Sequence, residues 1–156
     1  MIYQQQESQT RLSNIIKSFW MIDSEGDTNI NKQKIIPDGY PKMIFHYKDP
    51  YRININGEWH TQKNDLIAGQ ISNYFFLENT GESGMFAIKF QPWSLKILFD
   101  INVFSINDKV IEIDSQILER IHPLKEIAIN QSFSFQEKVK RIENWFITFL
   151  KTIDFN

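Results

Sequence analysis

The sequence has no cysteine, no long apolar run and no block of like charges. Without cysteine, disulfides, thiolate zinc sites and cysteine nucleophiles are excluded. No apolar run reaches the roughly 18 residues of a membrane-spanning helix, and the first residues are polar. With 17 basic and 19 acidic residues, no concentration of positive charge is present to hold nucleic acid or an anionic membrane. We therefore expect a cytoplasmic protein that contacts neither a membrane nor, by itself, DNA.

Motifs that carry common catalytic chemistry are also missing. The sequence contains no G-x-S-x-G, no phosphate-binding loop and no H-E-x-x-H. Its three histidines, His46, His60 and His122, include no His-x-His pair. We therefore predict no catalytic residue, no metal and no cofactor. One alternative stays open, in which His46 and His60 meet across adjacent strands and, with an acidic partner, hold a metal in a cupin-type enzyme.

Apolar and aromatic residues are abundant. They make up 42% and 14% of the 156 residues, and 13 of the aromatic residues are phenylalanine. A chain of this length fits one domain that buries most of its apolar surface. We therefore predict a single domain over residues 1–156, with either a bulky aromatic core or an aromatic-lined cavity.

The first part of the chain has the pattern of a β-protein. From about residue 34 to residue 90, short apolar runs alternate with turn residues. Asn56-Gly57 predicts a tight hairpin, and residues 85–90, MFAIKF, predict a strand with one core face and one mixed face. Residues 8–19 are expected to form a short helix that runs into a strand. Together these patterns predict an antiparallel β-barrel or sandwich over about residues 17–90.

One turn raises a question of function, because Pro37-Asp38-Gly39 directly precedes the apolar run PKMIFHY. Proline presets the backbone for a turn, and glycine is favoured at its end. Asp38 is a conceivable general base, but an aspartate in a turn more often accepts a hydrogen bond from its own backbone. We therefore interpret this turn as the corner between two strands.

After Gln91 the pattern becomes helical, over about residues 92–155. Pro92 is expected to open a helix with Trp93, Ile97 and Leu98 on one side. Asp114 is expected to cap a second helix that breaks at Pro123.

The last helix has the clearest pattern of the three. Ser134 and Glu137 have the spacing of a capping box. Apolar residues then recur every three or four positions, at Val139, Ile142, Phe146, Phe149 and Ile153. This seam predicts contact with another helix, and we propose it as the dimerisation surface of a homodimer. Packing on the protein's own sheet is the alternative.

A pocket in the β-rich part is the most plausible binding site, because barrels hold ligands in their mouths. The candidate contacts are aromatic or ring-bearing residues on the predicted strands, namely Tyr47, Trp59, Tyr74, Phe76 and His46. Trp59 and Tyr74 carry polar groups that need a partner when buried. Aromatic residues at strand spacing are also typical of an ordinary core, so this assignment is a hypothesis.

Five stretches together resemble a known family. KSFWMID, KIIPDGYPKMIFHY, DLIAGQ, FAIKFQPWSL and INDKVIEID occur in this order, in a resemblance that covers about residues 12–150. They resemble the N-terminal domain of bacterial AraC-type transcriptional regulators. The resemblance implies a cupin-like β-barrel followed by helices, which senses a small-molecule effector and forms dimers. In that family a C-terminal pair of helix-turn-helix units reads DNA.

The helix-turn-helix units are absent from these 156 residues. We therefore expect a fragment of a longer regulator rather than a stand-alone protein, with DNA bound only through the missing domain. The overall expectation is an α+β fold, with a cupin-like antiparallel β-barrel or sandwich followed by a C-terminal helical segment. The alternatives to an effector-sensing domain are the cupin-type metal-dependent enzyme and a dimerisation module without a ligand.

Overall fold

A computed structural model describes residues 1–153, which form two antiparallel sheets and four α-helices. The six-stranded sheet contains, in spatial order, β1 (Ile2–Glu7), β2 (Ile16–Asp23), β9 (Gly84–Phe90), β4 (Lys42–His46), β7 (Asp65–Ala68) and β10 (Val110–Glu112). The four-stranded sheet contains β3 (Lys32–Ile35), β8 (Phe75–Glu78), β5 (Arg52–Ile55) and β6 (Glu58–Thr61). The helices are α1 (Ser94–Phe99), α2 (Ser115–Arg120), α3 (His122–Ile129) and α4 (Phe135–Leu150).

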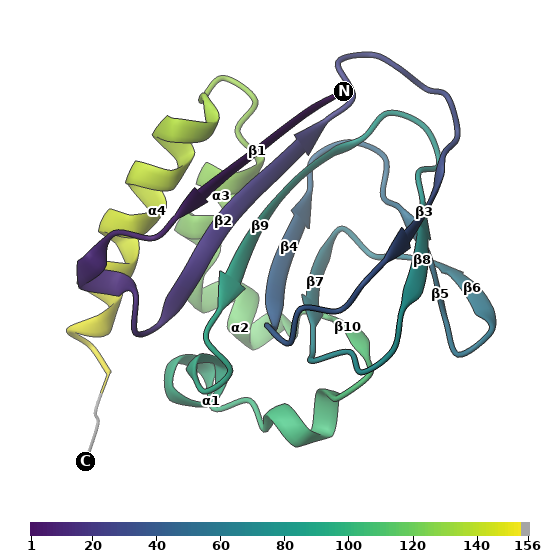
Figure 1. The fold of residues 1–156 in the computed structure, drawn as a ribbon. Helices are drawn as coiled ribbons and strands as arrows, with labels where there is room; N and C mark the ends of the chain where they lie inside the picture. Colours follow the sequence, from purple (N-terminus) through teal and green to yellow (C-terminus); the bar gives the residue numbers. More distant parts are fainter. Residues whose placement is uncertain (154–156) are drawn as a thin grey trace.

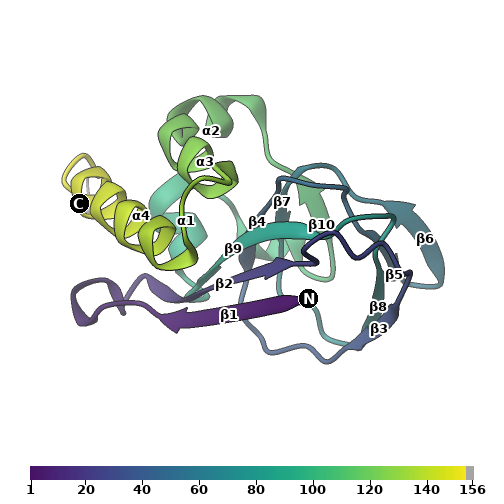
Figure 2. The ribbon, with the colours of Figure 1, turned by 90° about the horizontal axis from the view of Figure 1, so that it is seen from above.

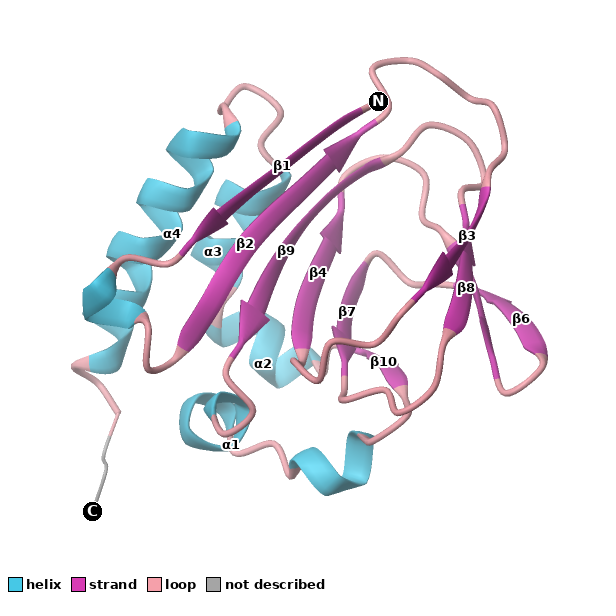
Figure 3. Cartoon of the chain, viewed as in Figure 1, coloured by secondary structure: helices cyan, strands magenta, loops and turns pink. Residues whose placement is uncertain are grey.

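The two sheets and the helices form layers (Figures 1 and 3). The helices lie on one side of the six-stranded sheet, and the four-stranded sheet lies on the other, as the view from above shows (Figure 2). Each sheet is hydrogen-bonded within itself, so the β-part is a sandwich rather than a single closed barrel. This arrangement confirms the predicted α+β fold with a C-terminal helical segment.

Side-chain alternation divides the six-stranded sheet into two faces. In β4, Met43 and Phe45 are buried in the core beneath the helices, whereas Lys42 and Ile44 face the second sheet. The same alternation in β9 confirms the predicted two faces of MFAIKF, of which Phe86, Ile88 and Phe90 form the core face. Both faces of the sheet are therefore covered, each by a different layer.

The core between the helices and the sheet is rich in phenylalanine. Ring centroids of Phe86 and Phe135 lie 6.0 Å apart, and Phe90 and Phe146 are also 6.0 Å apart in an edge-to-face arrangement. Such pairs hold α4 against the sheet by burial and by ring geometry. The abundance of phenylalanine in the sequence thus corresponds mainly to a bulky core on the helical side.

A lysine is buried within this core. Lys138 of α4 donates a hydrogen bond to the carbonyl oxygen of Ala128 at 2.8 Å, and its Nζ lies 4.4 Å from the ring centroid of Tyr47. Burial lowers the pKa of Lys138 to about 8, although Asp23 acts in the opposite direction. Tyr47 in turn donates to Asp23 Oδ2 at 2.9 Å, so α4 is joined to β2 and to the residue that follows β4.

Several local predictions are confirmed. Asn56 and Gly57 have φ values of 59° and 88°, as the hairpin between β5 and β6 requires. Asp114 accepts a hydrogen bond from the backbone of Gln116, and the helices α2 and α3 divide just before Pro123. Ser134 Oγ accepts from the backbone N–H of Glu137 at 3.1 Å at the start of α4.

Other local predictions differ from the structure. Residues 8–19 do run from a helical turn into a strand, but the turn is only the 3₁₀ segment Thr10–Leu12, and Ile16 and Phe19 already belong to β2. The strand β1 was not predicted, since its residues, IYQQQE, are mostly exposed and lack an apolar alternation. In α1, Trp93 precedes the helix and Ile97 is exposed, whereas Leu95 and Leu98 are buried.

The predicted helical part ends at about residue 155, and residues 154 and 155 lie outside the described residues. Within residues 1–153, none of the helices is both long enough and apolar enough to cross a membrane.

We predict that Phe146→Ala lowers the free energy of unfolding by about 3–5 kcal/mol, because it leaves a cavity in a fully buried aromatic cluster. Phe104→Ala is the matched control, since Phe104 is 80% exposed and its removal is expected to change stability by less than about 0.5 kcal/mol. Denaturant unfolding followed by circular dichroism measures both changes. Equal losses in the two variants would contradict the position of α4.

Candidate functional site

A cavity of about 430 Å³ lies between the two sheets. Its volume falls within the range of about 300–1,000 Å³ that is typical of small-molecule sites. Most of its wall is apolar. The six-stranded sheet contributes Trp20, Ile22, Ile44, Met85, Ala68 and Val110, and the four-stranded sheet with its flanks contributes Ile35, Ile53, Phe75 and Leu77.

The cavity arises from the same alternation that builds the core. In β8, Phe75 and Leu77 face the cavity, whereas Phe76 between them points away and packs edge-to-face on Tyr74 at 5.8 Å. In β4, Ile44 faces the cavity between two core residues. A step of one residue along any of these strands therefore moves a side chain from the cavity wall to the opposite face of its sheet.

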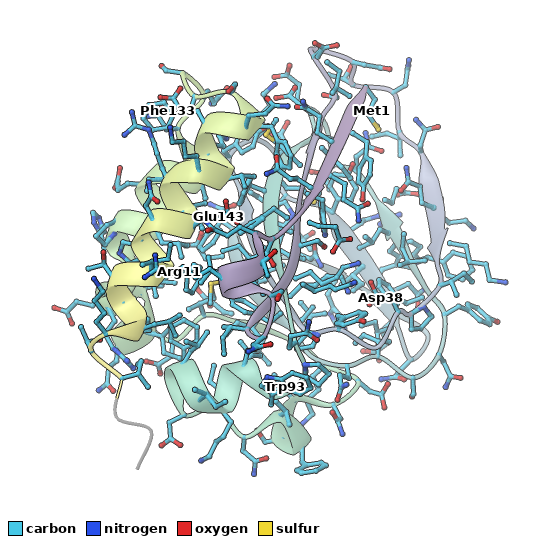
Figure 4. The ribbon with its side chains drawn as sticks, turned by 60° about the vertical axis from the view of Figure 1, so that its left-hand side comes forward. Met1, Arg11, Asp38, Trp93, Phe133 and Glu143 are labelled. Atoms are coloured by element: carbon cyan, nitrogen blue, oxygen red, sulfur yellow. The ribbon has the colours of Figure 1, made fainter. Side chains whose placement is uncertain are left out.

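The charged side chains of the described lining gather at one place. Lys42 and Lys89 are directly opposite each other on β4 and β9. Asp38, in the loop that joins β3 to β4, lies between them, with Oδ1 2.9 Å from Lys42 Nζ and Oδ2 2.6 Å from Lys89 Nζ. In Figure 4, Asp38 is labelled on the side of the molecule opposite α4. Opposed like charges destabilise a sheet, and here one carboxylate bridges both.

The ion pairs determine the protonation of this group. Partial burial by itself raises the pKa of Asp38, but hydrogen bonds from Lys89 and Lys42 outweigh that effect and lower the pKa to about 2. Burial lowers the pKa of Lys42, and Asp38 opposes this shift. Lys89 Nζ also lies 5.7 Å from the ring centroid of Tyr40, which adds a cation–π contact.

The turn at residues 37–39 is the corner that the sequence predicts. It leads from the four-stranded sheet to the six-stranded sheet, and Gly39 has a φ of 79°, which glycine adopts readily. Asp38 Oδ1 accepts from the backbone N–H of Tyr40 at 3.1 Å, as expected of an aspartate in a turn. The same turn, however, also brings the Asp38 carboxylate to the cavity.

None of the five residues predicted as ligand contacts belongs to the described lining of this cavity. Tyr47 lies beneath α4, and Tyr74 is exposed. The ring of Trp59 packs against the Arg52 guanidinium, whose Cζ lies 4.6 Å from the ring centroid. Phe76 points outward, and His46 is buried with its ring 6.3 Å from that of Tyr51. Their role as ligand contacts therefore stays a prediction that this cavity does not support.

The two histidines of the alternative metal site do not meet. His46 lies on β4 of the six-stranded sheet, whereas His60 lies on β6 of the other sheet, opposite Ile53. Their strands are not neighbours, so the predicted contact across adjacent strands is wrong. Over residues 1–153 no group of three or more His, Cys, Asp or Glu side chains is placed to hold a metal ion.

The predicted dimerisation residues divide into two groups. Val139, Ile142 and Phe146 are fully buried in the core of the same chain, which is the packing alternative considered for this helix. Phe149 is only partly buried and stacks on Trp145 at 4.7 Å, and Ile153 is also only partly buried.

Sequence reasoning missed Lys42 and Lys89. A signal for them existed, because each is a lysine within a run of apolar strand residues, KMIF and MFAIKF. A charged residue on the covered face of such a strand needs a partner.

These features define an α+β protein of the β-sandwich type, with helices on one outer face and a cavity between its sheets. Residues 4–112 match the family DUF6597, which is described as a domain of unknown function. The chain belongs to this family, which is associated with AraC-type regulators, and this confirms the resemblance found in the sequence.

Among solved structures, the chain is similar to the AraC-like transcriptional activator CuxR, with a TM-score of 0.42 and 10% sequence identity. The similarity covers 96% of this chain and 61% of the CuxR chain, so it spans less than two thirds of that structure. No match was found among curated proteins.

We predict that the Asp38 carboxyl titrates near pH 2 instead of near its ordinary value of 3.8. The folded-state pKa is the lower one, so ionised Asp38 stabilises the fold above about pH 4, and this contribution is lost as the pH falls towards 2. Carboxyl carbon chemical shifts in a pH titration measure the midpoint. A midpoint near 3.8, unchanged in Lys89→Met, would show that the bridge does not hold in solution.

Proposed function

We propose that this chain is the regulatory domain of an AraC-type transcriptional regulator, in which a small effector binds the cavity between the sheets and the domain forms a homodimer. The family association supports the regulatory role. The cavity is the single observation that carries effector binding, because a volume of about 430 Å³ with apolar walls and a few charged groups is typical of ligand sites. In this proposal DNA is read by a part of the regulator outside residues 1–156.

Binding rather than catalysis is supported by the charged groups at the cavity. A general base is most effective when its pKa lies near the working pH. The pKa of Asp38 is lowered to about 2, and both of its carboxylate oxygens are engaged by lysines. An aspartate held in this way is a poor proton acceptor at neutral pH, so we propose no catalytic step for it.

A route from the cavity to the helices is present in the strands themselves. Lys42 and Ile44 face the cavity from β4, while Met43 and Phe45 of the same strand lie in the core beneath the helices. The helix α3 contacts both β4 and β9, and it packs on α4. An effector that shifts these strands therefore changes the surface on which α3 and α4 pack. The effector can regulate only to the extent that it binds one arrangement of strands and helices more tightly than the other.

The cavity proposal predicts that the neutral dye N-phenyl-1-naphthylamine binds and becomes fluorescent. Leu77→Trp, which occupies part of the cavity, is expected to weaken binding nearly tenfold, because excluding the dye from about 50 Å² of wall costs about 1.3 kcal/mol. Phe76→Trp is the matched control, since the neighbouring side chain points away from the cavity. Equal binding by both variants would contradict a ligand site at this place.

The dimer is proposed to form through the part of the α4 seam that remains accessible, around Phe149. Sedimentation velocity is expected to show a dimer of the wild-type chain and a folded monomer of Phe149→Glu. Thr148→Glu adds the same charge at the next position, which is exposed, and is expected to remain dimeric. Phe146→Glu is unsuitable as a test, because that side chain is fully buried and the change unfolds the chain. A dimeric Phe149→Glu variant would refute this surface.

A further inference from the structure

The charge of the cavity indicates what kind of effector it takes. Asp38, Lys42 and Lys89 are the charged side chains of the described lining, so one positive charge is left unbalanced. The rest of the described lining is formed mainly by aliphatic and aromatic side chains. A ligand that matches both parts has an apolar body and one anionic head.

The geometry of the two lysines is that of an anion site already occupied by a side chain. Lys42 and Lys89 are opposed across β4 and β9, and their ammonium groups converge on the two oxygens of one carboxylate. Each ammonium group carries three N–H donors. Lys42 uses one for Asp38 and a second for the Tyr40 carbonyl oxygen at 3.0 Å. Asp38 therefore stands where the carboxylate of a ligand fits.

The position of Asp38 on a loop makes this replacement feasible. Unlike the two lysines, which are fixed in central strands of the sheet, Asp38 lies on the connection between β3 and β4. The backbone of the connection is held on the C-terminal side of Asp38, by hydrogen bonds from Gln70 Nε2 to the Gly39 carbonyl oxygen at 2.8 Å and from the Phe90 N–H to the Pro41 carbonyl oxygen at 2.9 Å. Ile36, at the start of the connection, is 69% exposed although it also borders the cavity.

We propose that the effector is an apolar monocarboxylate, whose head binds Lys42 and Lys89 in place of Asp38 and whose body fills the space between the sheets. This inference rests on the proposed function, since it specifies the ligand of the same cavity. Asp38 acts as a built-in competitor that pairs with both lysines when no ligand is bound. Its displacement frees the loop between β3 and β4, so the charged end of the cavity is also the part that responds to the ligand.

Calorimetric titration at neutral pH with octanoate, 1-octanol and octylamine tests this inference, because the three probes share one apolar chain and differ in charge. Octanoate is expected to bind about tenfold or more tightly than octanol, as a charge-assisted hydrogen bond contributes that much, and octylamine is expected to bind least. Lys42→Met and Lys89→Met are each expected to abolish the preference for octanoate while the affinity for octanol is kept. Asp38→Asn is expected to tighten octanoate binding.

The remaining outcomes separate the two proposals. Equal binding of octanoate and octanol, unchanged in the lysine variants, would overturn the carboxylate inference and leave effector binding in the cavity intact. A preference for octylamine would assign the anchoring role to Asp38 and would also overturn the carboxylate inference. If none of the three probes binds, the inference fails, whereas the cavity itself is judged by the neutral dye and its Leu77→Trp variant. Circular dichroism of each variant checks that a loss of binding is not a loss of folding.

Discussion

The central strands β4 and β9 are covered on both faces, and this constraint governs the rest of the structure. On one face their phenylalanine, methionine and isoleucine side chains are buried against α3 and α4. On the other face the same strands carry Ile44, Met85 and the two opposed lysines towards the second sheet. Because one pair of strands forms both the core and the cavity wall, neither layer can shift without affecting the other.

The lysine pair is placed in the sheet at an energetic cost. Two ammonium groups directly opposite each other on neighbouring strands repel, and a stable sheet requires that this repulsion be offset. Asp38 offsets it through both oxygens, and the same contacts lower the pKa of its carboxyl group to about 2. A site built only for stability is better served by an apolar pair at these positions. The presence of two lysines in place of an apolar pair therefore fits the proposal that they recognise a ligand.

Much of the fold could be predicted from local patterns, because turns and helix caps depend on neighbouring residues. Asn56-Gly57, the break before Pro123 and the cap at Ser134 were all located correctly for this reason. The strand β1 could not be found in this way, since its polar residues form a strand only by pairing with β2. The predicted ligand contacts stay a prediction, and they do not coincide with the lining of the cavity. Tyr74 and Phe76 were chosen because they are aromatic, but their neighbours Phe75 and Leu77 face the cavity.

The sequence by itself determined the α+β class, the order of a strand-rich first part and a helical second part, and the corner at Asp38. These properties follow from composition, periodicity and turn chemistry, which act over a few residues. Only the tertiary structure decided which face of each strand is inside, because both faces of a doubly covered sheet are apolar and the pattern is then ambiguous. It also decided that Lys89 meets Asp38 and Lys42, since the pairing of β4 with β9 brings Lys89 from a distant part of the chain to the loop that precedes β4.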